Sequence, residues 1–403
     1  MKILIYMAIG FDTYGPSRHL YNALIEDLLM QGHTVHLIEN HSTGNDPDAP
    51  DNLTAFDSFS YETVASTPVE KRAFVKRYLT GVKYCFDCIP VFKKQRNFDV
   101  MMIQSCPWAP FAVSFAKKYV NIPIVWNIQD MFPGASIANG VMKKKWMQKF
   151  FYRFQKIAYK KADHISVISE DMKKKVIEQG VSSDCITVIP DWYDDKSVKE
   201  IPWKENLFVK KYNMRKDVFY VQYAGTMGFN FDYRMVINVA QILVNQKDIV
   251  FQMIGFGSQK DDFVNSVKEY GLNNVEFFPL EPQEMVPHVY SACSVCLIPL
   301  PRGVIGNSVP SKAGLLMACR RVIVNSVDED SDYYQMFERE QIGISASNAD
   351  PKAVAAAILK MRDNPELREQ YAENAKKFSL GFYSRTVNTQ KHIDLLVKIA
   401  KEN

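Results

Sequence analysis

Residues 220–228, Tyr-Val-Gln-Tyr-Ala-Gly-Thr-Met-Gly, decide the fold, because a short apolar run ends there in a glycine-rich turn. The run predicts a strand over 220–224, and we expect a helix from Tyr233 to Asn245 after the turn. A second strand over 250–255 and a second helix over 260–270 repeat the order. Short apolar strands that alternate with helices predict a parallel sheet with helices on both faces.

The same alternation extends in both directions along the chain. Residues 191–216 are polar and aromatic without a clear period, which is typical of a linker or interdomain loop. The predicted fold is therefore α/β, with two Rossmann-like doubly wound domains and a cleft between them at the carboxyl ends of both sheets. The other expected strands lie at 3–7, 34–39, 100–104, 124–127, 164–168, 186–189, 275–278, 295–298, 321–325 and 343–345, and the other helices at 20–29, 313–319, 350–363, 366–377 and 384–401.

Three segments follow from this pattern. Residues 1–190 are the expected N-terminal Rossmann-like domain and residues 191–380 the C-terminal one. Residues 381–403 are an expected helix that packs back toward the N-terminal domain. At 403 residues, the chain is long enough for two or three domains with large cores. Its 47% hydrophobic and 23% charged residues exclude a disordered chain, a collagen and a disulfide scaffold.

Several absences bear on compartment and cofactors. No stretch reaches the ~18 to 20 uninterrupted apolar residues of a membrane span. Residues 1–6 form a short apolar strand without a small-residue cleavage site, so a cytoplasmic protein is expected. The seven cysteines are scattered, which suits a reducing compartment and roles in packing. The histidines lack metal spacing, so no bound metal is expected. No cofactor is expected either.

Positive charge is confined to one half of the chain. Residues 67–190 carry 21 Lys/Arg against nine Asp/Glu, a local net of +12 in a chain of +4. Two aromatic-rich segments, 71–96 and 143–161, carry much of this charge, and the second holds eight Lys/Arg and no acid. This concentration indicates a surface for an anionic partner.

The second basic segment has the pattern of an amphipathic helix. Trp146, Phe150 and Phe154 recur at helical spacing, while Lys149 and Arg153 fall elsewhere around the helix. A basic helix with aromatic residues is typical of a membrane interface. The alternatives are packing on its own domain and, less favoured, nucleic-acid binding.

Glycine-rich strand ends suggest an anion site in the second half. The turn Gly225-Thr226-Met227-Gly228 lies between a strand and a helix, where backbone N–H groups and a helix N-terminus suit an anion. Gly255 and Gly257 end the next expected strand, but the third glycine of a dinucleotide fingerprint is missing. A glycine turn without a ligand remains the alternative.

Two polar stretches extend this pattern. In Val309-Pro310-Ser311-Lys312, proline suits a helix start, serine a cap and lysine a point charge for phosphate. Residues 328–331 follow a strand, where acidic oxygens could receive ribose hydroxyls. Taken together, the glycine turns and these two polar stretches predict a nucleotide site, which none of them predicts alone.

The first half offers one carboxylate for chemistry. Asp130 comes directly after the expected strand at 124–127 and faces the predicted cleft. A loop cap or an ordinary surface acid is the alternative. No Ser-His-Asp or His-Glu-x-x-His pattern supports hydrolase chemistry of those types.

These motifs together resemble the family-4 glycosyltransferases of GT-B fold. The subgroup most similar builds capsules, O-antigens and colanic-acid-like exopolysaccharides, and has an Asp-Leu-Trp-Pro-like element where Asp130-Met131-Phe132-Pro133 stands. The resemblance covers essentially the whole chain. It implies transfer from a nucleotide-sugar, expected to be a UDP-sugar, with retention and without a bound metal. It is carried by residues 162–169, 188–192, 223–228, 254–257, 279–280 and 309–312.

Carried over by position, the resemblance divides the site residues into two groups. Those expected on the donor side are Gly225, Thr226, Met227, Gly228, Gly255, Gly257, Pro279, Leu280, Val309, Pro310, Ser311, Lys312, Glu329 and Asp330. Those expected on the acceptor side are Tyr14, Gly15 and Arg18.

The chain departs from the family pattern at three places. Many members carry two glutamates eight residues apart, which touch the donor sugar and the ribose; Asn307 and Leu315 stand there instead. The usual Gly-x-Pro after the following helix is replaced by Arg320-Arg321. Glu329 or Asp330 is the candidate substitute for the ribose contact.

The resemblance implies a front-face transfer. Asp130 would orient the acceptor hydroxyl or accept its proton, while Lys312 and backbone N–H groups would stabilise the leaving diphosphate. A saccharide or polyprenyl-linked acceptor would explain the basic aromatic segments, which would then hold the protein at the inner face of the cell membrane. The alternatives are a soluble enzyme acting on a small sugar, a nucleotide-sugar epimerase of the same fold, and a non-catalytic interaction protein.

Overall fold

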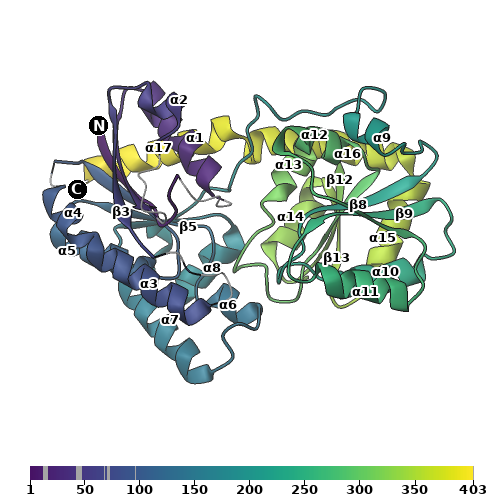
Figure 1. Cartoon of the computed structure of the whole chain (residues 1–403), viewed down its shortest axis with the longest axis horizontal. Helices are drawn as coiled ribbons and strands as arrows, with labels where there is room; N and C mark the ends of the chain where they lie inside the picture. Colours follow the sequence, from purple (N-terminus) through teal and green to yellow (C-terminus); the bar gives the residue numbers. More distant parts are fainter. Residues whose placement is uncertain (12–16, 42–47, 68, 70–72, 96, 403) are drawn as a thin grey trace. The chain divides into compact units, whose positions relative to one another are not determined.

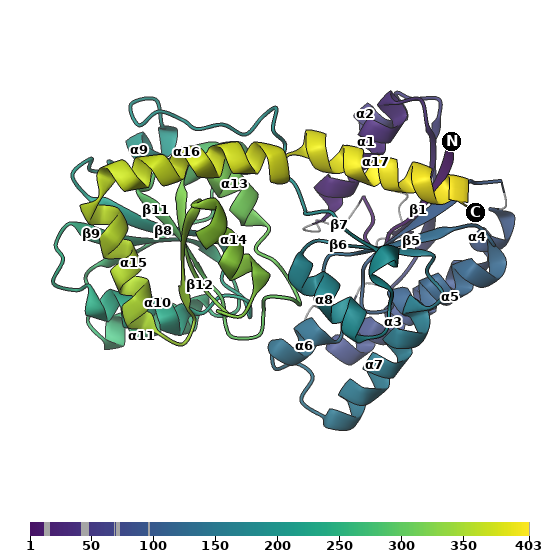
Figure 2. The same ribbon diagram turned by 180° about the vertical axis from the view of Figure 1, so that it is seen from behind.

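The chain folds into two compact units. The computed structural model describes residues 1–11, 17–41, 48–67, 69, 73–95 and 97–402. Unit 1 comprises Met1–Asp191 and Asn388–Asn403, and unit 2 comprises Trp192–Val387. Each unit holds one parallel sheet flanked by helices (Figure 1, Figure 2), which confirms the predicted architecture of two doubly wound α/β domains. Within the described residues, no helix is long and apolar enough to cross a membrane.

Unit 1 is built on a seven-stranded sheet in the order β3-β2-β1-β4-β5-β6-β7. The central strands β4 and β5 are buried at every position, as expected for a parallel sheet covered on both faces. The strands are β1 (Lys2–Tyr6), β2 (Thr34–His41), β3 (Phe59–Ala65), β4 (Val100–Gln104), β5 (Ile124–Ile128), β6 (His164–Val167) and β7 (Ile186–Val188). The helices are α1 (Arg18–Met30), α2 (Asp51–Thr54), α3 (Phe74–Asp87), α4 (Ile89–Lys94), α5 (Ala109–Tyr119), α6 (Gly134–Ala138), α7 (Lys145–Tyr159) and α8 (Glu170–Glu178), with a 3₁₀ turn at Ser183–Cys185.

Unit 2 repeats the design with six strands in the order β10-β9-β8-β11-β12-β13. Its core has two apolar layers: α10, α11 and α15 contribute to one, and α12, α13 and α14 to the other. The strands are β8 (Phe219–Thr226), β9 (Ile249–Phe256), β10 (Val275–Phe278), β11 (Val295–Pro299), β12 (Val322–Val327) and β13 (Gly343–Ser347). The helices are α9 (Leu207–Lys211), α10 (Tyr233–Ile242), α11 (Lys260–Glu269), α12 (Val286–Ser291), α13 (Lys312–Ala318), α14 (Asp332–Glu340), α15 (Pro351–Asp363) and α16 (Pro365–Phe382), with a 3₁₀ turn at Gln283–Met285; α17 (Arg385–Glu402) runs from unit 2 into unit 1.

Strand β3 and the helices of the first basic segment go beyond the sequence prediction for unit 1. Strand β3, at the edge of the sheet, pairs with β2 from Phe59 to Ala65, and its residues are only half-buried or exposed. Its apolar content is therefore low, and the pattern of short apolar runs did not identify it. The basic segment 71–96 also contains α3 and α4, whose buried residues include Tyr84, Cys85 and Phe92.

Residues 192–206 are packed on unit 2, so the linker expected over 191–216 is wrong for this part of the chain. The side-chain amide of Asn206 donates to the carbonyl of His288 at 2.8 Å. The backbone N–H of Ile201 donates to Ser291 Oγ at 2.9 Å. Asn206 also caps α9 through its side-chain oxygen. Residues 192–206, whose polar sequence lacks a helix or strand period, therefore form an extended segment along unit 2, here called the strap.

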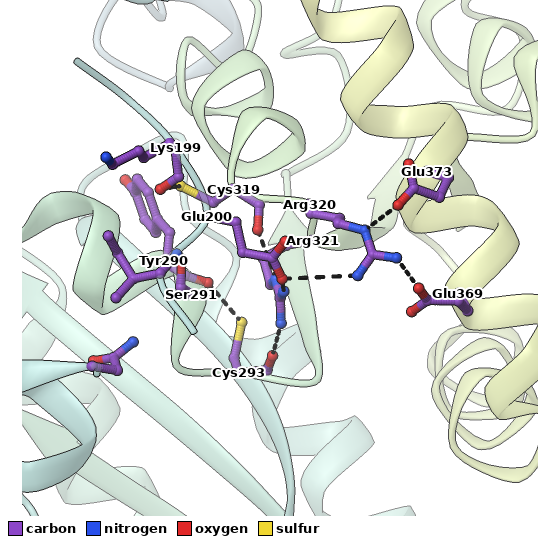
Figure 3. A network of polar contacts seen from close by, with 12 residues as sticks. Lys199, Glu200, Tyr290, Ser291, Cys293, Cys319, Arg320, Arg321, Glu369 and Glu373 are labelled. Atoms are coloured by element: carbon purple, nitrogen blue, oxygen red, sulfur yellow. Dashed lines mark hydrogen bonds and ion pairs between the residues drawn. The ribbon is translucent and has the colours of Figure 1, made fainter. Parts of the chain in front are cut away.

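Arg321 holds this strap from the other side (Figure 3). Its Nη2 donates to Glu200 at 2.6 Å, and its Nη1 donates to the carbonyl of Cys293 at 2.9 Å. Its Nε donates to the carbonyl of Cys319 at 2.9 Å. One guanidinium therefore joins the strap, the start of β11 and the end of α13, using the planar fork that distinguishes arginine from lysine.

The neighbouring Arg320 fastens α16 to the same corner. It pairs with Glu369, and its Nε lies 2.5 Å from Glu373 (Figure 3). Its backbone has φ of 58°, in the left-handed region that glycine adopts without cost. The arginine that replaces the family's glycine thus combines an unfavourable backbone with favourable ion pairs.

We expect Arg320→Ala to lower the thermal unfolding temperature more than Arg320→Gly does. Both variants lose the carboxylate pairs, but only alanine keeps the Cβ, which costs roughly 1 kcal/mol in this backbone region. Parallel melts by circular dichroism at one scan rate would measure the difference. A lower unfolding temperature for the glycine variant would contradict this account of the turn.

Candidate functional site

The carboxyl ends of β8 and β9 approach each other too closely for side chains at several positions. Gly225 lies opposite Gly255 in the parallel register. A Cβ on Gly255 would lie 2.0 Å from the carbonyl oxygen of Gly225, and one on Gly257 would lie 2.3 Å from that of Met227. These glycines therefore have a packing reason of their own, and they keep side chains away from positions 225, 255 and 257.

Lys312, at the start of α13, places its ammonium at this strand end. Its Nζ donates to the carbonyl of Ala224 at 3.0 Å and lies 3.7 Å from the centre of the Tyr223 ring. A Cβ on Gly225 would lie 2.6 Å from the same nitrogen. The structure thus brings together Lys312 and the Gly225 turn, which are 87 positions apart in sequence. No carboxylate in the described residues pairs with Lys312, and burial lowers the pKa of this lysine to about 7.

The other donor-side residues surround the same sheet edge with different exposure. Met227 is buried, whereas Thr226, Pro279 and Leu280 are exposed at the ends of β8 and β10. Ser311 occupies the N-cap position of α13 but makes no capping hydrogen bond through its side chain, so the predicted cap is wrong. Its backbone is already helical, which turns the hydroxyl away from the first N–H groups. Gly228, Val309 and Pro310 are partly buried.

The loop before α13 is held by an aspartate of the neighbouring strand end. Asp328 accepts hydrogen bonds from the N–H of Gly303 at 2.9 and 3.0 Å and from the amide of Asn348 at 3.2 Å. Asn307, where many family members have glutamate, is buried and donates to the carbonyl of Gly303 at 2.8 Å. The position therefore stabilises the loop in this chain.

The carboxylates of Glu329 and Asp330 are exposed just beyond Asp328. Ser331 accepts a hydrogen bond from the N–H of Tyr334 and caps α14. Leu315, at the second glutamate position, is partly buried and packs against the apolar layer of α13. Of the acidic residues in this region, Glu329 and Asp330 thus remain available to a ligand.

A second lysine lies at this edge and was not among the predicted site residues. Lys260, the first residue of α11, donates from Nζ to the carbonyl of Gly255 at 2.7 Å. Lys312 and Lys260 belong to helices of different apolar layers, so they reach the edge from opposite faces of the sheet. A basic residue in the first helical turn after the Gly255–x–Gly257 strand end was the signal that could have identified it.

In unit 1, Arg18 forms a buried ion pair with Glu39. Its Nη1 lies 2.8 Å from Glu39 Oε2, and the two side chains are 9% and 0% exposed. The guanidinium also stacks 3.6 Å from the centre of the Phe11 ring and donates to the carbonyl of Ile9. Arg18 therefore holds residues 9–11 in place. Tyr14 and Gly15, the other two residues expected on the acceptor side, lie outside the described residues.

The carboxyl edge of the unit 1 sheet carries two neighbouring carboxylates. Asp130 is exposed, two residues beyond β5. Asp191, which lies in a stretch that carries the family resemblance but was not among the predicted site residues, follows β7 and accepts a hydrogen bond from Gln129 Nε2 at 2.9 Å. Burial and the charge of Asp130 raise the pKa of Asp191 to about 6, against the opposing effect of the Gln129 hydrogen bond.

The basic helix α7 divides its aromatic residues between packing and exposure. Phe154 contacts Phe111 of α5, with ring centroids 4.6 Å apart. Trp146 and Phe150 are 67% and 60% exposed, and Lys149 and Arg153 are exposed on the same helix. Packing within the domain therefore accounts for Phe154 but leaves the outer aromatic residues uncovered by described residues of the chain.

The cysteines and acidic groups show little sign of metal chemistry. In the described residues, no group of three or more His, Cys, Asp or Glu side chains is placed to hold a metal ion. All seven cysteines are free, and five are buried as expected for packing. Cys185 is exposed, so the packing role predicted for it is wrong. Cys293 and Cys296 have sulfurs 3.4 Å apart in the core of unit 2.

Two family descriptions cover most of the chain. Residues 15–197 match Glycosyltransferase Family 4, and residues 205–378 match Glycosyl transferases group 1. The chain is 26% identical to "Probable glycosyltransferase WbjE" of Pseudomonas aeruginosa over 64% of its own length and 62% of that protein. It is 23% identical to "Putative colanic acid biosynthesis glycosyl transferase WcaI" of Escherichia coli over 90% of its length and 91% of that protein.

Solved structures show the same fold over the full chain. Sucrose-phosphate synthase from Thermosynechococcus elongatus has a TM-score of 0.76 at 15% identity, with complete coverage of both chains. HepE from Anabaena, in complex with UDP, has a TM-score of 0.71 at 14% identity and covers 99% of this chain and 100% of its own. WaaG, a glycosyltransferase involved in lipopolysaccharide biosynthesis, has a TM-score of 0.68 at 13% identity, over 98% and 99% of the two chains.

Proposed function

The chain belongs to the family-4 glycosyltransferases of GT-B fold, and on this premise we propose that it transfers a sugar from a nucleotide-sugar to a saccharide acceptor during polysaccharide synthesis. The expected donor is a UDP-sugar, because the HepE structures of the same fold contain UDP and UDP-glucose. Transfer with retention, which the family resemblance implies, is part of this proposal. The family matches favour transfer over the epimerase and non-catalytic alternatives.

The observation that carries the proposal is the position of the Lys312 ammonium over the Gly225 turn. Its positive charge is held by a carbonyl and an aromatic face, and no carboxylate of the described residues competes for it. A diphosphate at the glycine-lined strand end would meet this charge and unobstructed backbone. As the sugar leaves, the same charge would stabilise the developing negative charge on the diphosphate.

The acceptor is proposed to lie on the unit 1 side. Asp130, at the carboxyl edge of that sheet, is the candidate that orients the acceptor hydroxyl or accepts its proton. Asp130 would then activate the acceptor, while Lys312 would stabilise the leaving diphosphate.

Unit 1 also offers a surface for an anionic membrane. On α7, Trp146 and Phe150 are exposed beside lysine and arginine, and on α3 the apolar residues Val75 and Leu79 are exposed as well. Aromatic and apolar side chains flanked by cations match the boundary between lipid headgroups and acyl chains. We therefore propose that α7 attaches the protein to the cytoplasmic face of the membrane, where a lipid-linked acceptor would be presented.

A nucleotide panel tests the donor proposal. We expect UDP to raise the thermal unfolding temperature more than GDP, dTDP, CMP or ADP, because ligand at 100 times its dissociation constant stabilises a fold by about 2.7 kcal/mol. Lys312→Ala should abolish the response, since it removes the charge at the glycine turn. A panel without any response, or a UDP response unchanged in this variant, would refute the assignment.

The affinity for a UDP-sugar is expected to fall as the pH rises. Lys312 is charged below its pKa of about 7 and loses its charge above it. If only the charged form binds, affinity should drop roughly thirtyfold between pH 6 and pH 8.5. A UDP-sugar is the right probe, because its diphosphate has no ionisation in this range. Calorimetric titration at both pH values would measure the change.

The control for this titration is Lys312→Arg. Arginine stays charged throughout the range, so its affinity should be nearly independent of pH. An equally flat profile for the unmodified protein would show that Lys312 does not titrate at the diphosphate.

Vesicle co-sedimentation tests the membrane surface. The unmodified protein should bind vesicles containing phosphatidylglycerol but not neutral phosphatidylcholine vesicles, because each basic residue near an anionic surface contributes about 1 kcal/mol. The triple change of Lys149, Arg153 and Lys156 to Glu should release it. The matched control replaces Lys173, Lys174 and Lys175 of α8 by Glu and should leave binding intact. Equal binding by both triple variants would contradict a role for α7.

A further inference from the structure

Polar side chains from α1, β4, β5 and β6 meet at the carboxyl edge of the unit 1 sheet. Tyr21 donates to Asn127 Oδ1 at 2.7 Å, and Asn127 donates onward to Ser166 Oγ at 3.0 Å. Gln104 accepts from the N–H of Ala8 at 3.0 Å and donates to a serine of the α1 entry. These buried groups thus satisfy one another, as polar groups removed from water must.

Asp191 lies close enough to Tyr21 to affect its pKa, but its own hydrogen bonding is different. Gln129 Nε2 donates to its Oδ1 at 2.9 Å, which fixes the orientation of the carboxylate. No hydrogen bond from the described residues reaches its Oδ2. A carboxylate oxygen accepts hydrogen bonds and donates none, so the open position calls for a donor. The residue lies three positions beyond the end of β7, at the edge where parallel α/β sheets receive ligands.

The charges around Asp191 determine which kind of molecule can donate a hydrogen bond to its Oδ2. The charged neighbour that acts on Asp191 is Asp130, a second carboxylate, and Arg18 of the nearby α1 is paired with Glu39. Two adjacent negative charges disfavour a phosphate or a carboxylate ligand. A neutral molecule that presents hydroxyl groups, such as a saccharide, satisfies an open carboxylate oxygen without this repulsion.

We propose that Asp191 binds the saccharide acceptor by accepting a hydrogen bond from one of its hydroxyl groups, while Gln129 holds the carboxylate in position. This inference rests on the proposed function, which supplies the acceptor, and adds to it a residue that binds that acceptor. Asp130 then lies beside the bound hydroxyl. Asp191 fixes which hydroxyl is presented, so it determines the specificity for the acceptor.

The proposal implies that acceptor binding weakens in acid. The groups that face Asp191 are Asp130 beyond β5, Gln129, and Tyr21 on α1, whose own pKa is raised by burial and by Asp191. Because the pKa of Asp191 is about 6, its carboxylate is present at pH 7.5 and mostly protonated at pH 5. Acceptor affinity should therefore be roughly tenfold weaker at pH 5 than at pH 7.5.

The test uses the full chain, UDP and a panel of methyl glycosides of glucose, galactose, mannose, rhamnose and N-acetylglucosamine. Saturation-transfer NMR in the presence of UDP should detect at least one glycoside, bound more tightly at pH 7.5 than at pH 5. Asp191→Asn should weaken that binding at least tenfold and remove its pH dependence, with unchanged affinity for UDP. The matched control, Asp184→Asn, changes an exposed carboxyl at the opposite end of β7 and should bind as the unmodified protein does.

The outcomes separate this inference from the proposed function. If the protein binds UDP but no glycoside, or if Asp191→Asn binds glycosides as well as the unmodified protein at both pH values, Asp191 does not bind the acceptor and the donor proposal stands. If neither UDP nor any glycoside binds, both proposals fail. Should Asp191→Asn lose UDP binding as well, its effect is structural and the acceptor role is refuted.

Discussion

The close approach of two backbones at the ends of β8 and β9 is the constraint on which the donor-side geometry depends. With 2.0 Å between the carbonyl of Gly225 and a hypothetical Cβ on Gly255, no other residue fits without moving a strand. The absence of side chains there is also what allows Lys312 to reach the carbonyl of Ala224. One packing requirement of the sheet thus creates the open strand end and admits the charge that occupies it.

At its own sheet edge, unit 1 buries polar and charged side chains. It buries an arginine and a glutamate together, and it buries several amides and hydroxyls that hydrogen-bond to one another. A buried ion pair adds little net stability, because desolvation offsets the attraction, but removing one partner is costly. Arg18 and Glu39 are therefore best understood as a device that fixes residues 9–11 at the entrance to α1, rather than as free ligands.

Most of the architecture could be predicted from the sequence, because central parallel strands are short, apolar and separated by helices. The half-buried edge strand β3 could not, since an edge strand lacks that apolar signal. The turn at Gly225 and the charge at Lys312 were predicted on the same site, and the structure brings them together. Asp191 was missed as a site residue, because its position depends on a contact with Gln129 that no local motif encodes. Lys260 was missed although a basic residue in the first helical turn after the Gly255–x–Gly257 strand end was a signal for it. Ser311 is a prediction that failed. The sequence places it at the N-cap of α13, but its helical backbone prevents the capping hydrogen bond of its side chain.

The unit 2 sheet edge carries two lysines together with the exposed Glu329 and Asp330, whereas the unit 1 edge carries the carboxylates of Asp130 and Asp191. In unit 2, Lys312 and Lys260 each rest on a backbone carbonyl and have no carboxylate partner among the described residues. In unit 1, the arginine is neutralised by Glu39, while Asp130 and Asp191 remain as carboxylates. Under the proposed function, a diphosphate would be attracted to the lysines of the unit 2 edge and repelled by the carboxylates of the unit 1 edge, which would accept hydrogen bonds from a saccharide hydroxyl. On this proposal, charge would direct donor and acceptor to different edges before any contact with the sugar itself is made.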